Sequence, residues 1–290
     1  MKAMQAMNHV KLEQRYLKQF HSVDLSADFY YSNDMDITQP WPESFNRSHN
    51  VSEKYCWNHH LLQQVPSNWG LHLIHGFVGS RRLSRLFNSP EVILIGRRSA
   101  RFAGTRFNRR GQDLDGNVAN EVETEQIVYR RGMNSSITSF LHHRGSVPIF
   151  WSQDMGSVPQ KPPIQIDHCD PWYQACGKHF KSLFERYGGP IIAFNLVKKN
   201  TSGEEDLGTA FEAAVIYLNQ FLPAARNIIW KWVDIAKLRK LGHFGDEFNQ
   251  ECRDLVNLVG ISSTCRKQTG AVRYRTIYII QNSRFKCGPF

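Results

Sequence analysis

The stretch DPWYQACGKHFKSLFERYGGPIIAFNLV, residues 170–197, decides the fold class. Asp170 can cap a helix and Pro171 suits its first turn. Apolar side chains then recur at helical spacing, at Trp172, Cys176, Phe180, Leu183, Phe184 and Tyr187. Gly188-Gly189 is a typical helix end, and a β-rich apolar run from Pro190 to Val197 follows directly. A helix that leads into a buried strand is half of a βαβ unit, so this stretch predicts an α/β domain.

Helices and strands alternate further along the chain as well. The pattern predicts a second helix from Glu204 to Leu222, a strand at Asn227 to Trp232 and more helix to about Val259. Before residue 170 it predicts a helix at 10–20, an extended run at 29–31, a surface loop at 38–52, one or two helical turns at 57–65, and strands at 71–78, 92–95, 120–130 and 137–151. We therefore expect an α/β fold with a mixed, partly parallel sheet flanked by helices.

Composition and charge narrow the class of protein. The 41% of hydrophobic residues suits a folded chain, and the formal net charge of +10 favours anionic partners such as phosphorylated lipids or acidic membrane surfaces, although it can equally serve solubility. Six scattered cysteines without a CxxC pair argue against a disulfide framework. We see no signal peptide and no apolar stretch near the ~20 residues that a membrane span needs. Nucleic-acid binding has no recognisable motif to support it.

The densest polar signal is RRSARFAGTRFNRRGQDLDGNVANEVETEQIVYRR, residues 97–131. Arginine binds phosphate with a bidentate fork, so Arg98, Arg101 and Arg106 are candidates for contact with a polyanionic head group. The acids Glu121, Glu123 and Glu125 alternate, which places them on one face of a strand. They can form an ion-pair network that orients the arginines, or serve as general acids or metal ligands; a salt-bridged surface hairpin explains them equally well.

Four residues complete the candidate set of seven. Glu123, Glu125 and the adjacent Gln126 can position the basic groups. Arg144 opens a second segment, RGSVPIFWSQ, that can line a cleft or form an edge strand with a buried Trp151. The scattered histidines and cysteines do not complete a zinc site, so we expect no metal and no cofactor.

Several separate blocks resemble the Sac-domain phosphoinositide phosphatases. The segment 97–126 is similar to that family's signature, and so, in the same order, are DLSADFYYSNDMDIT at 24–38, YCWNHHLL at 55–62, LHLIHGFVG at 71–79 and HHRGSVPIFWSQ at 142–153. The block AAVIYLNQFLP at 213–223 and WVDIAKLRK at 232–240 resemble the branch that removes the 5-phosphate of phosphatidylinositol 3,5-bisphosphate. Agreement over many blocks makes chance a poor explanation.

The resemblance implies an organisation, partners and a location. Residues 1–66 would be the tail of a β-rich N-terminal subdomain, and residues 67–290 the first part of the catalytic subdomain. Implied partners are phosphoinositide lipids in membranes, together with a helical-repeat scaffold and a phosphoinositide kinase; no nucleic acid is expected. The implied location is peripheral, on the cytosolic face of endosomal, lysosomal or vacuolar membranes.

The family's chemistry requires a cysteine thiolate, five further residues and an arginine, because the loop and the arginine cradle the phosphate that the thiolate attacks. The sixth residue after each cysteine that has one is Leu62, Ala175, Ser182, Leu258 or Ala271, never arginine. Gln268, Gly270 and Arg273 resemble the lead-in to that loop, after which the likeness ends. We therefore expect a chain truncated at both ends, without catalytic residues and inactive as written; the alternative is a non-enzymatic phosphoinositide-binding or scaffold subunit.

Overall fold

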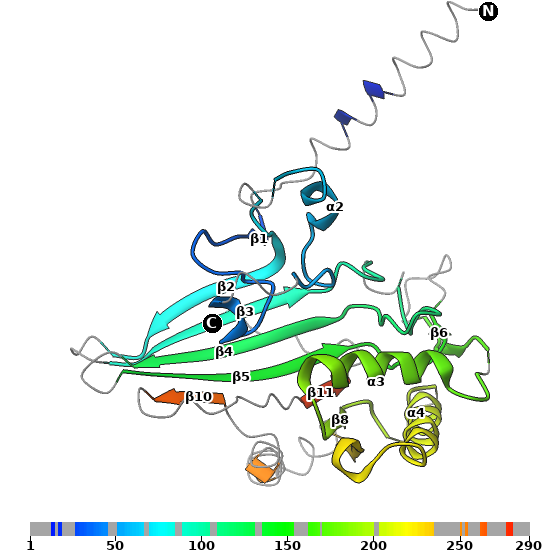
Figure 1. The fold of residues 1–290 in the computed structure, drawn as a ribbon. Coiled ribbons are helices and arrows are strands. Elements are labelled where there is room, and N and C mark those ends of the chain that lie inside the picture. Colours follow the sequence, from blue (N-terminus) through cyan, green and yellow to red (C-terminus); the bar gives the residue numbers. More distant parts are fainter. Residues whose placement is uncertain are drawn as a thin grey trace, which may run out of the picture.

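The computed structural model describes residues 27–45, 51–66, 70–84, 89–104, 109–130, 135–153, 162–168, 170–199, 203–234, 262–265 and 277–280, with isolated helical positions at 13–14, 17–18, 250 and 253–254. Figure 1 shows long strands that extend from a body of helices and shorter strands. The expected helix at 10–20 and the helix leading to Val259 lie mostly outside the described residues.

The described strands form one large mixed sheet. Its antiparallel part runs in the order β1-β2-β3-β4-β5, with β1 at Phe29–Tyr30, β2 at Ile74–Arg82, β3 at Glu91–Arg98, β4 at Val122–Arg130 and β5 at Ser136–Gly145. A short strand β10, Ser262–Cys265, pairs with β5 antiparallel, and β6 (Trp151–Ser152) pairs with β7 (Gln165–Ile166) separately. The strands expected at 71–78, 92–95, 120–130 and 137–151 are thus confirmed, with the last ending at Gly145.

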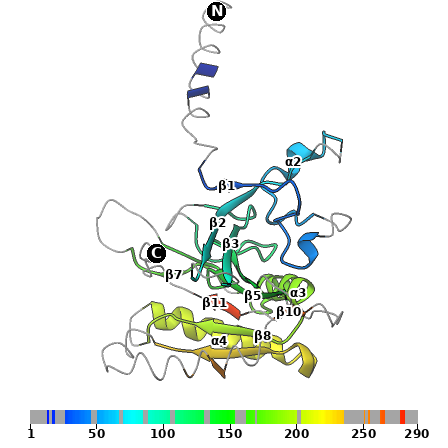
Figure 2. The ribbon, with the colours of Figure 1, turned by 90° about the vertical axis from the view of Figure 1, so that its left-hand side faces the viewer.

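The parallel part continues the same sheet. Strand β8, Ile191–Asn195, pairs parallel with β9, Ile228–Trp232, and helix α4, Glu204–Asn219, connects them. Strand β11, Ile277–Ile280, lies between β5 and β8 and is parallel to both. Figure 2 shows β1 to β3 on one side of the molecule and β8 with α4 on the other, with β5 and β11 between them. The expected mixed, partly parallel sheet with flanking helices is confirmed.

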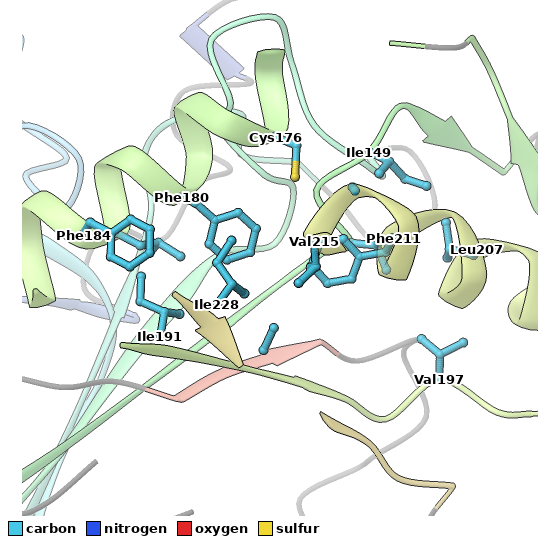
Figure 3. Packing of buried hydrophobic residues seen from close by; sticks show 14 of the residues in the cluster. Ile149, Cys176, Phe180, Phe184, Ile191, Val197, Leu207, Phe211, Val215 and Ile228 are labelled. Carbon is cyan, nitrogen blue, oxygen red and sulfur yellow. The ribbon is translucent and has the colours of Figure 1, made fainter. Parts of the chain in front are cut away.

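The main core lies between the parallel part of the sheet and two helices. Helix α3, Gln174–Tyr187, contributes Cys176, Phe180 and Phe184, and α4 contributes Leu207, Phe211 and Val215 (Figure 3). They pack on Ile191, Ala193 and Ile228 of the strands and on Leu141 of β5. Every residue of β8 is buried, as expected for a central parallel strand covered on both faces.

The start of α3 differs from the sequence-based prediction. The helix begins at Gln174, not at Pro171, and Tyr173 at its N-cap position has a left-handed backbone with φ of 47°. Asp170 still caps it, but from further away: its side-chain oxygen accepts the backbone N–H of Ala175 at 3.1 Å. The helix ends at Gly188 with a positive φ of 72°, as the glycine pair predicted.

The segment at 38–52 is not the surface loop that its polar residues suggested. Its first part turns inward: Thr38, Trp41 and Ser44 are all buried, and Glu43–Phe45 forms a 3₁₀ turn, η1. Together with Ile37 it covers a second core, which contains Ile74, Ile95 and Ile127 of β2, β3 and β4. Residues 46–50 lie outside the described part of the chain. The polar character was misleading because buried arginines bind the backbone of this loop, as shown below.

Two of the remaining short elements were expected, and one was not. Phe29 and Tyr30 form β1, and one helical turn, α2, covers His59–Leu62. A second 3₁₀ turn, η2, at Ala224–Arg226 leads into β9.

Candidate functional site

The strand register sorts the predicted site residues onto two faces. Directly paired residues share a face, and side chains alternate along a strand. Glu123 pairs with Arg97 of β3 and with His143 of β5, so these three share the face on which α3 packs, which we call the helix face. Arg98, Gln126 and Arg144 lie on the opposite, far face. The structure therefore does not gather all seven candidates into one cleft.

Glu123 is the centre of a buried network on the helix face. Its carboxylate is fully buried and accepts hydrogen bonds from Arg97 Nη1 at 3.0 Å and from Arg186 Nε at 2.7 Å and Nη2 at 3.0 Å. The Tyr187 hydroxyl also donates to it. Two guanidinium groups and a phenol thus surround one carboxylate, which joins β3, β4 and α3.

Glu125 and the two arginines fix the inward-turned loop. Glu125 Oε2 accepts from Arg97 Nη2 at 2.5 Å, and its Oε1 accepts from the backbone N–H of Trp41 at 2.8 Å and from Ser139 Oγ at 2.7 Å. The same arginines donate to loop carbonyls, Arg97 to those of Ile37 and Gln39 and Arg186 to that of Thr38. Of the alternatives for the alternating acids, the structure shows the ion-pair network for Glu123 and Glu125.

The electrostatics of this network favour the charged carboxylate. Burial alone opposes the charged form of Glu123, but Arg186, Arg97 and the Tyr187 hydroxyl outweigh it and lower the pKa to about 2. Burial and the charge of Glu123 raise the pKa of Tyr187 well above its usual value. Glu123 therefore stays ionised and Tyr187 stays neutral at physiological pH, which suits a structural centre.

Glu121 anchors a second buried cluster beside the first. It forms an ion pair with Lys54, and its Oε1 lies 2.8 Å from His143 Nε2; both Glu121 and His143 are almost wholly buried. The His179 ring of α3 is tilted against the His143 ring, with 6.4 Å between the ring centroids, and its Nδ1 lies 3.0 Å from the carbonyl oxygen of Gly116. Lys54 outweighs the burial of Glu121, with help from His143, and lowers the pKa of that carboxyl below its usual range. This cluster attaches the 109–121 loop to α3.

Two of the candidate arginines, Arg98 and Arg144, lie on the far face at one end of the sheet. Arg98 and Arg144 both pair directly with Val122, from opposite sides, so neighbouring strand spacing puts their Cα atoms roughly 10 Å apart. Arg144 is exposed, while Arg98 is half-buried and donates from Nη2 to the carbonyl of Gly104 at 2.6 Å. Burial, together with the charge of Arg98, lowers the pKa of His75 next to it.

The other candidates lie apart from this pair. Arg101 is exposed and forms an ion pair with the equally exposed Glu53 at 2.8 Å. Gln126 is exposed on the far face, four residues along β4 from Val122 and thus roughly 13 Å away. Arg106 lies outside the described residues.

Strand β5 ends at the same edge as the arginine pair, and the structure adds residues there that the sequence analysis did not select. Arg110 is nearly buried, donates from Nε to Gln153 Oε1 at 2.9 Å and stacks over the Trp151 ring at 5.4 Å. The N–H of Gly111 donates to Ser146 Oγ at 3.0 Å. Arg110 could have been selected from the arginine-rich segment, but nothing in the sequence marks Lys54 or Arg186 as network partners.

The two cysteines whose side chains are described are poor nucleophiles. Burial raises the pKa of Cys56 to about 11 and that of Cys176 still further. A thiolate is the reactive form, so neither side chain is activated.

Over the described residues, no group of three or more His, Cys, Asp or Glu side chains is arranged to hold a metal ion. No helix in that part of the chain is both long and apolar enough to cross a bilayer.

Comparison with known proteins decides the family. The model of the SacI homology domain matches residues 2–240. The chain belongs to this family. The Sac-domain resemblance of the arginine-rich segment and its neighbouring blocks is thereby confirmed at family level.

Curated SacI-domain relatives agree. The chain is 36% identical to a polyphosphoinositide phosphatase of Schizosaccharomyces pombe over 92% of its length and 37% identical to an Arabidopsis thaliana phosphatidylinositol-3-phosphatase SAC1 over 79%. It is 33% identical to a phosphatidylinositol-3-phosphatase SAC1-B of Danio rerio over 72% of its length. The chain spans 36%, 27% and 37% of these three proteins, between about a quarter and somewhat more than a third of each. All three names refer to phosphoinositides; the two SAC1 proteins are named 3-phosphatases, and the name of the Schizosaccharomyces pombe protein specifies no phosphate position.

Removing the Glu123 carboxylate should strongly destabilise this SacI-domain chain. Glu123→Ala leaves Arg97 and Arg186 buried without their shared partner, which costs ~3–5 kcal/mol in comparable buried pairs. Urea denaturation followed by circular dichroism measures the change. Gln126→Ala, on the exposed face of the same strand, is the matched control and should stay within ~0.5 kcal/mol of the parent. Equal effects of the two substitutions would contradict the network.

Acid should destabilise the fold through His179. Burial, helped by Lys54 and His143 and opposed by Glu121, lowers the pKa of His179 from 6.5 to about 3. Between these values the unfolded chain binds a proton that the folded chain does not, so the free energy of unfolding falls as the pH drops.

Urea denaturation at neutral and mildly acidic pH tests this dependence. His179→Gln should lose less stability on acidification than the parent chain, because the group that gains the proton is gone. His60→Gln, at an exposed position, should behave like the parent. An unchanged pH dependence in His179→Gln would rule out this role.

Proposed function

We propose that the chain binds the head group of phosphatidylinositol 3,5-bisphosphate. The site is the end of the sheet where Arg98 and Arg144 share the far face. The shared register of these two arginines around Val122 is the observation that carries the proposal. Guanidinium groups on flexible side chains at this spacing can converge on one phosphate or bind adjacent phosphates, and the planar fork matches each phosphate bidentately.

The other candidates have graded roles in this proposal. Arg101 lies apart from the arginine pair and Arg106 lies outside the described residues, so we assign neither of them a contact with the head group. Glu123 and Glu125 support the site indirectly, because their ion pairs with Arg97 hold β3 and β4 together. Arg98 lies next to Arg97 on β3, and Val122 lies next to Glu123 on β4. Gln126 lies too far along β4 to contact a phosphate held by the arginine pair, so we assign it no contact.

We propose further that the parent activity is hydrolysis of the 5-phosphate and that the chain as given binds without hydrolysing. The polyphosphoinositide phosphatase relative and the block at 213–223 support the substrate choice. The lack of a cysteine followed six residues later by arginine, and the raised pKa of Cys56, support the lack of turnover. This favours a binding subunit, working peripherally at endosomal or vacuolar membranes with a helical-repeat scaffold and a lipid kinase.

The division of the chain near residue 66 stays a prediction of the same kind. Residues 1–66 are proposed as the tail of an N-terminal subdomain and residues 67–290 as part of the catalytic subdomain. Strand β1 nevertheless pairs with β2, so the two proposed parts share one sheet.

Substituting the arginine pair should remove head-group recognition. In flotation with vesicles that contain phosphatidylinositol 3,5-bisphosphate, the Arg98→Gln/Arg144→Gln variant should bind at least about tenfold more weakly, since each charge-assisted hydrogen bond contributes ~1.5–3 kcal/mol. Arg130→Gln is the matched control, because Arg130 is an exposed arginine on the same face at the other end of β4. Equal losses in both variants would show general charge attraction and contradict the site.

Phosphate release tests the second part of the proposal. A malachite-green assay of the 290-residue chain with phosphatidylinositol 3,5-bisphosphate should give no release above background. Robust release would contradict it and require a nucleophile other than the loop cysteine.

A further inference from the structure

Charge is sorted between the two faces of the antiparallel strands β2 to β5. The strand register assigns every side chain of these strands to the helix face or to the far face. The far face carries four arginines and no acid: Arg81, Arg98, Arg130 and Arg144. The acids of these four strands all lie on the helix face: Glu91, Glu123 and Glu125. A sheet face with cations and without acids attracts an anionic partner.

The cross-strand pairs show the same separation. On the helix face, Arg82 of β2 pairs directly with Glu91 of β3, so an acid lies opposite the cation. On the far face, the next residue of β2, Arg81, pairs with Val92, and Arg130 of β4 pairs with a serine. Both Arg81 and Arg130 are exposed. Their charge is therefore directed outward without a neutralising neighbour across the strands.

The arginines of the far face lie at its two ends. Arg98 and Arg144 flank Val122, at the end to which the head group is assigned. Arg81 lies in the row of Val128, six residues along β4, and Arg130 lies eight residues along it, so the two ends are roughly 20–27 Å apart. One head group held at the first end leaves the second end without a contact. An anionic partner that reaches both ends has to be an extended surface.

An exposed aromatic ring lies between the two ends. Phe77 of β2 pairs with Gly96 on the far face and is 52% exposed. Its ring extends over Gly79, because a Cβ atom at that glycine would lie 2.7 Å from the ring atom Cζ. Leu94, which pairs with Gly79, is half-buried beside it. Phenylalanine and leucine between basic side chains are typical of a surface that lies on a membrane.

We propose that the far face of β2 to β5 is the surface with which the chain lies on an anionic bilayer. The arginine pair assigned to the head group is on this same face, and the lipid that carries the head group keeps its acyl chains in a bilayer. Arginines near such a surface are attracted by anionic lipids. A second copy of the chain is disfavoured, because two such faces would bring arginines against arginines. The inference rests on the proposed phosphoinositide function for the choice of a lipid surface.

Vesicle binding of the full chain tests the surface. With vesicles of phosphatidylcholine and phosphatidylserine, without phosphoinositide, the Arg81→Gln/Arg130→Gln variant should have a partition coefficient at least about tenfold lower than that of the parent. Lys178→Gln/Lys181→Gln is the matched control, because it removes the same charge from exposed lysines of α3, on the other side of the sheet. It should bind like the parent. All four substitutions are at exposed positions, so thermal melting should be unchanged.

A second measurement uses the parent chain alone. Phenylglyoxal modifies exposed arginines, and mass spectrometry reports the rate at each position. Phosphatidylserine vesicles should protect Arg81 and Arg130 but not Arg226, which is exposed beside the cavity between α3 and the end of α4. Equal protection of Arg226, or equal losses in the two double variants, overturns the proposal. So does a parent chain that stays off phosphatidylserine vesicles, which would leave the face to an acidic protein.

The two proposals can fail separately. Added phosphatidylinositol 3,5-bisphosphate should strengthen vesicle binding of the Arg81→Gln/Arg130→Gln variant as much as that of the parent, because Arg98 and Arg144 remain. Binding that depends on Arg81 and Arg130 without this gain would overturn the head-group site and leave the bilayer surface standing. A gain without that dependence would do the reverse. Arg130→Gln alone should cost no more than about fivefold, less than the loss expected for the head-group pair.

Discussion

The fold depends on one buried carboxylate held between two arginines. Glu123 joins Arg97 of β3 to Arg186 of α3, and the same two arginines bind the carbonyls of the loop at 37–39. The antiparallel strands, the helix layer and the N-terminal loop meet at this point. An ionised network can exist there only because nearly every donor has an acceptor, since a buried charge without a partner is costly. The segment that looked most like a ligand site in the sequence is therefore partly a structural centre.

The alternation of acids in the segment ETEQ separates two tasks on one strand. Side chains at 123 and 125 turn towards the helices and hold the layers together, whereas those at 122, 124 and 126 face the other way. The arginine pair of the far face flanks Val122, at the end of the strand where the network is strongest. Rigid strands position a binding group better than a mobile loop does, which gives the buried network an indirect role in recognition.

The spacing of apolar residues predicted the helices and strands well, because the buried side chains of a helix or a strand recur at the period of that element. The helix at α3, the buried strand β8 and the crossover through α4 all follow from their apolar patterns. The position of β11 and the inward turn at Thr38 could not be predicted that way, since they depend on contacts between residues far apart in the chain. For the site, the candidate residue types were visible, but their separation onto two faces required the register of β3, β4 and β5.

Strand β11 makes the assembly of the sheet depend on distant parts of the chain. Residues 277–280 lie between β5, which ends at residue 145, and β8, which ends at residue 195. The meander β2 to β5 can form from neighbours in sequence, and the β8-α4-β9 unit can form on its own. Until β11 enters, however, each half keeps an open strand edge where the other half belongs. During synthesis on the ribosome, both edges would stay open to pairing with other chains until residue 280 has emerged.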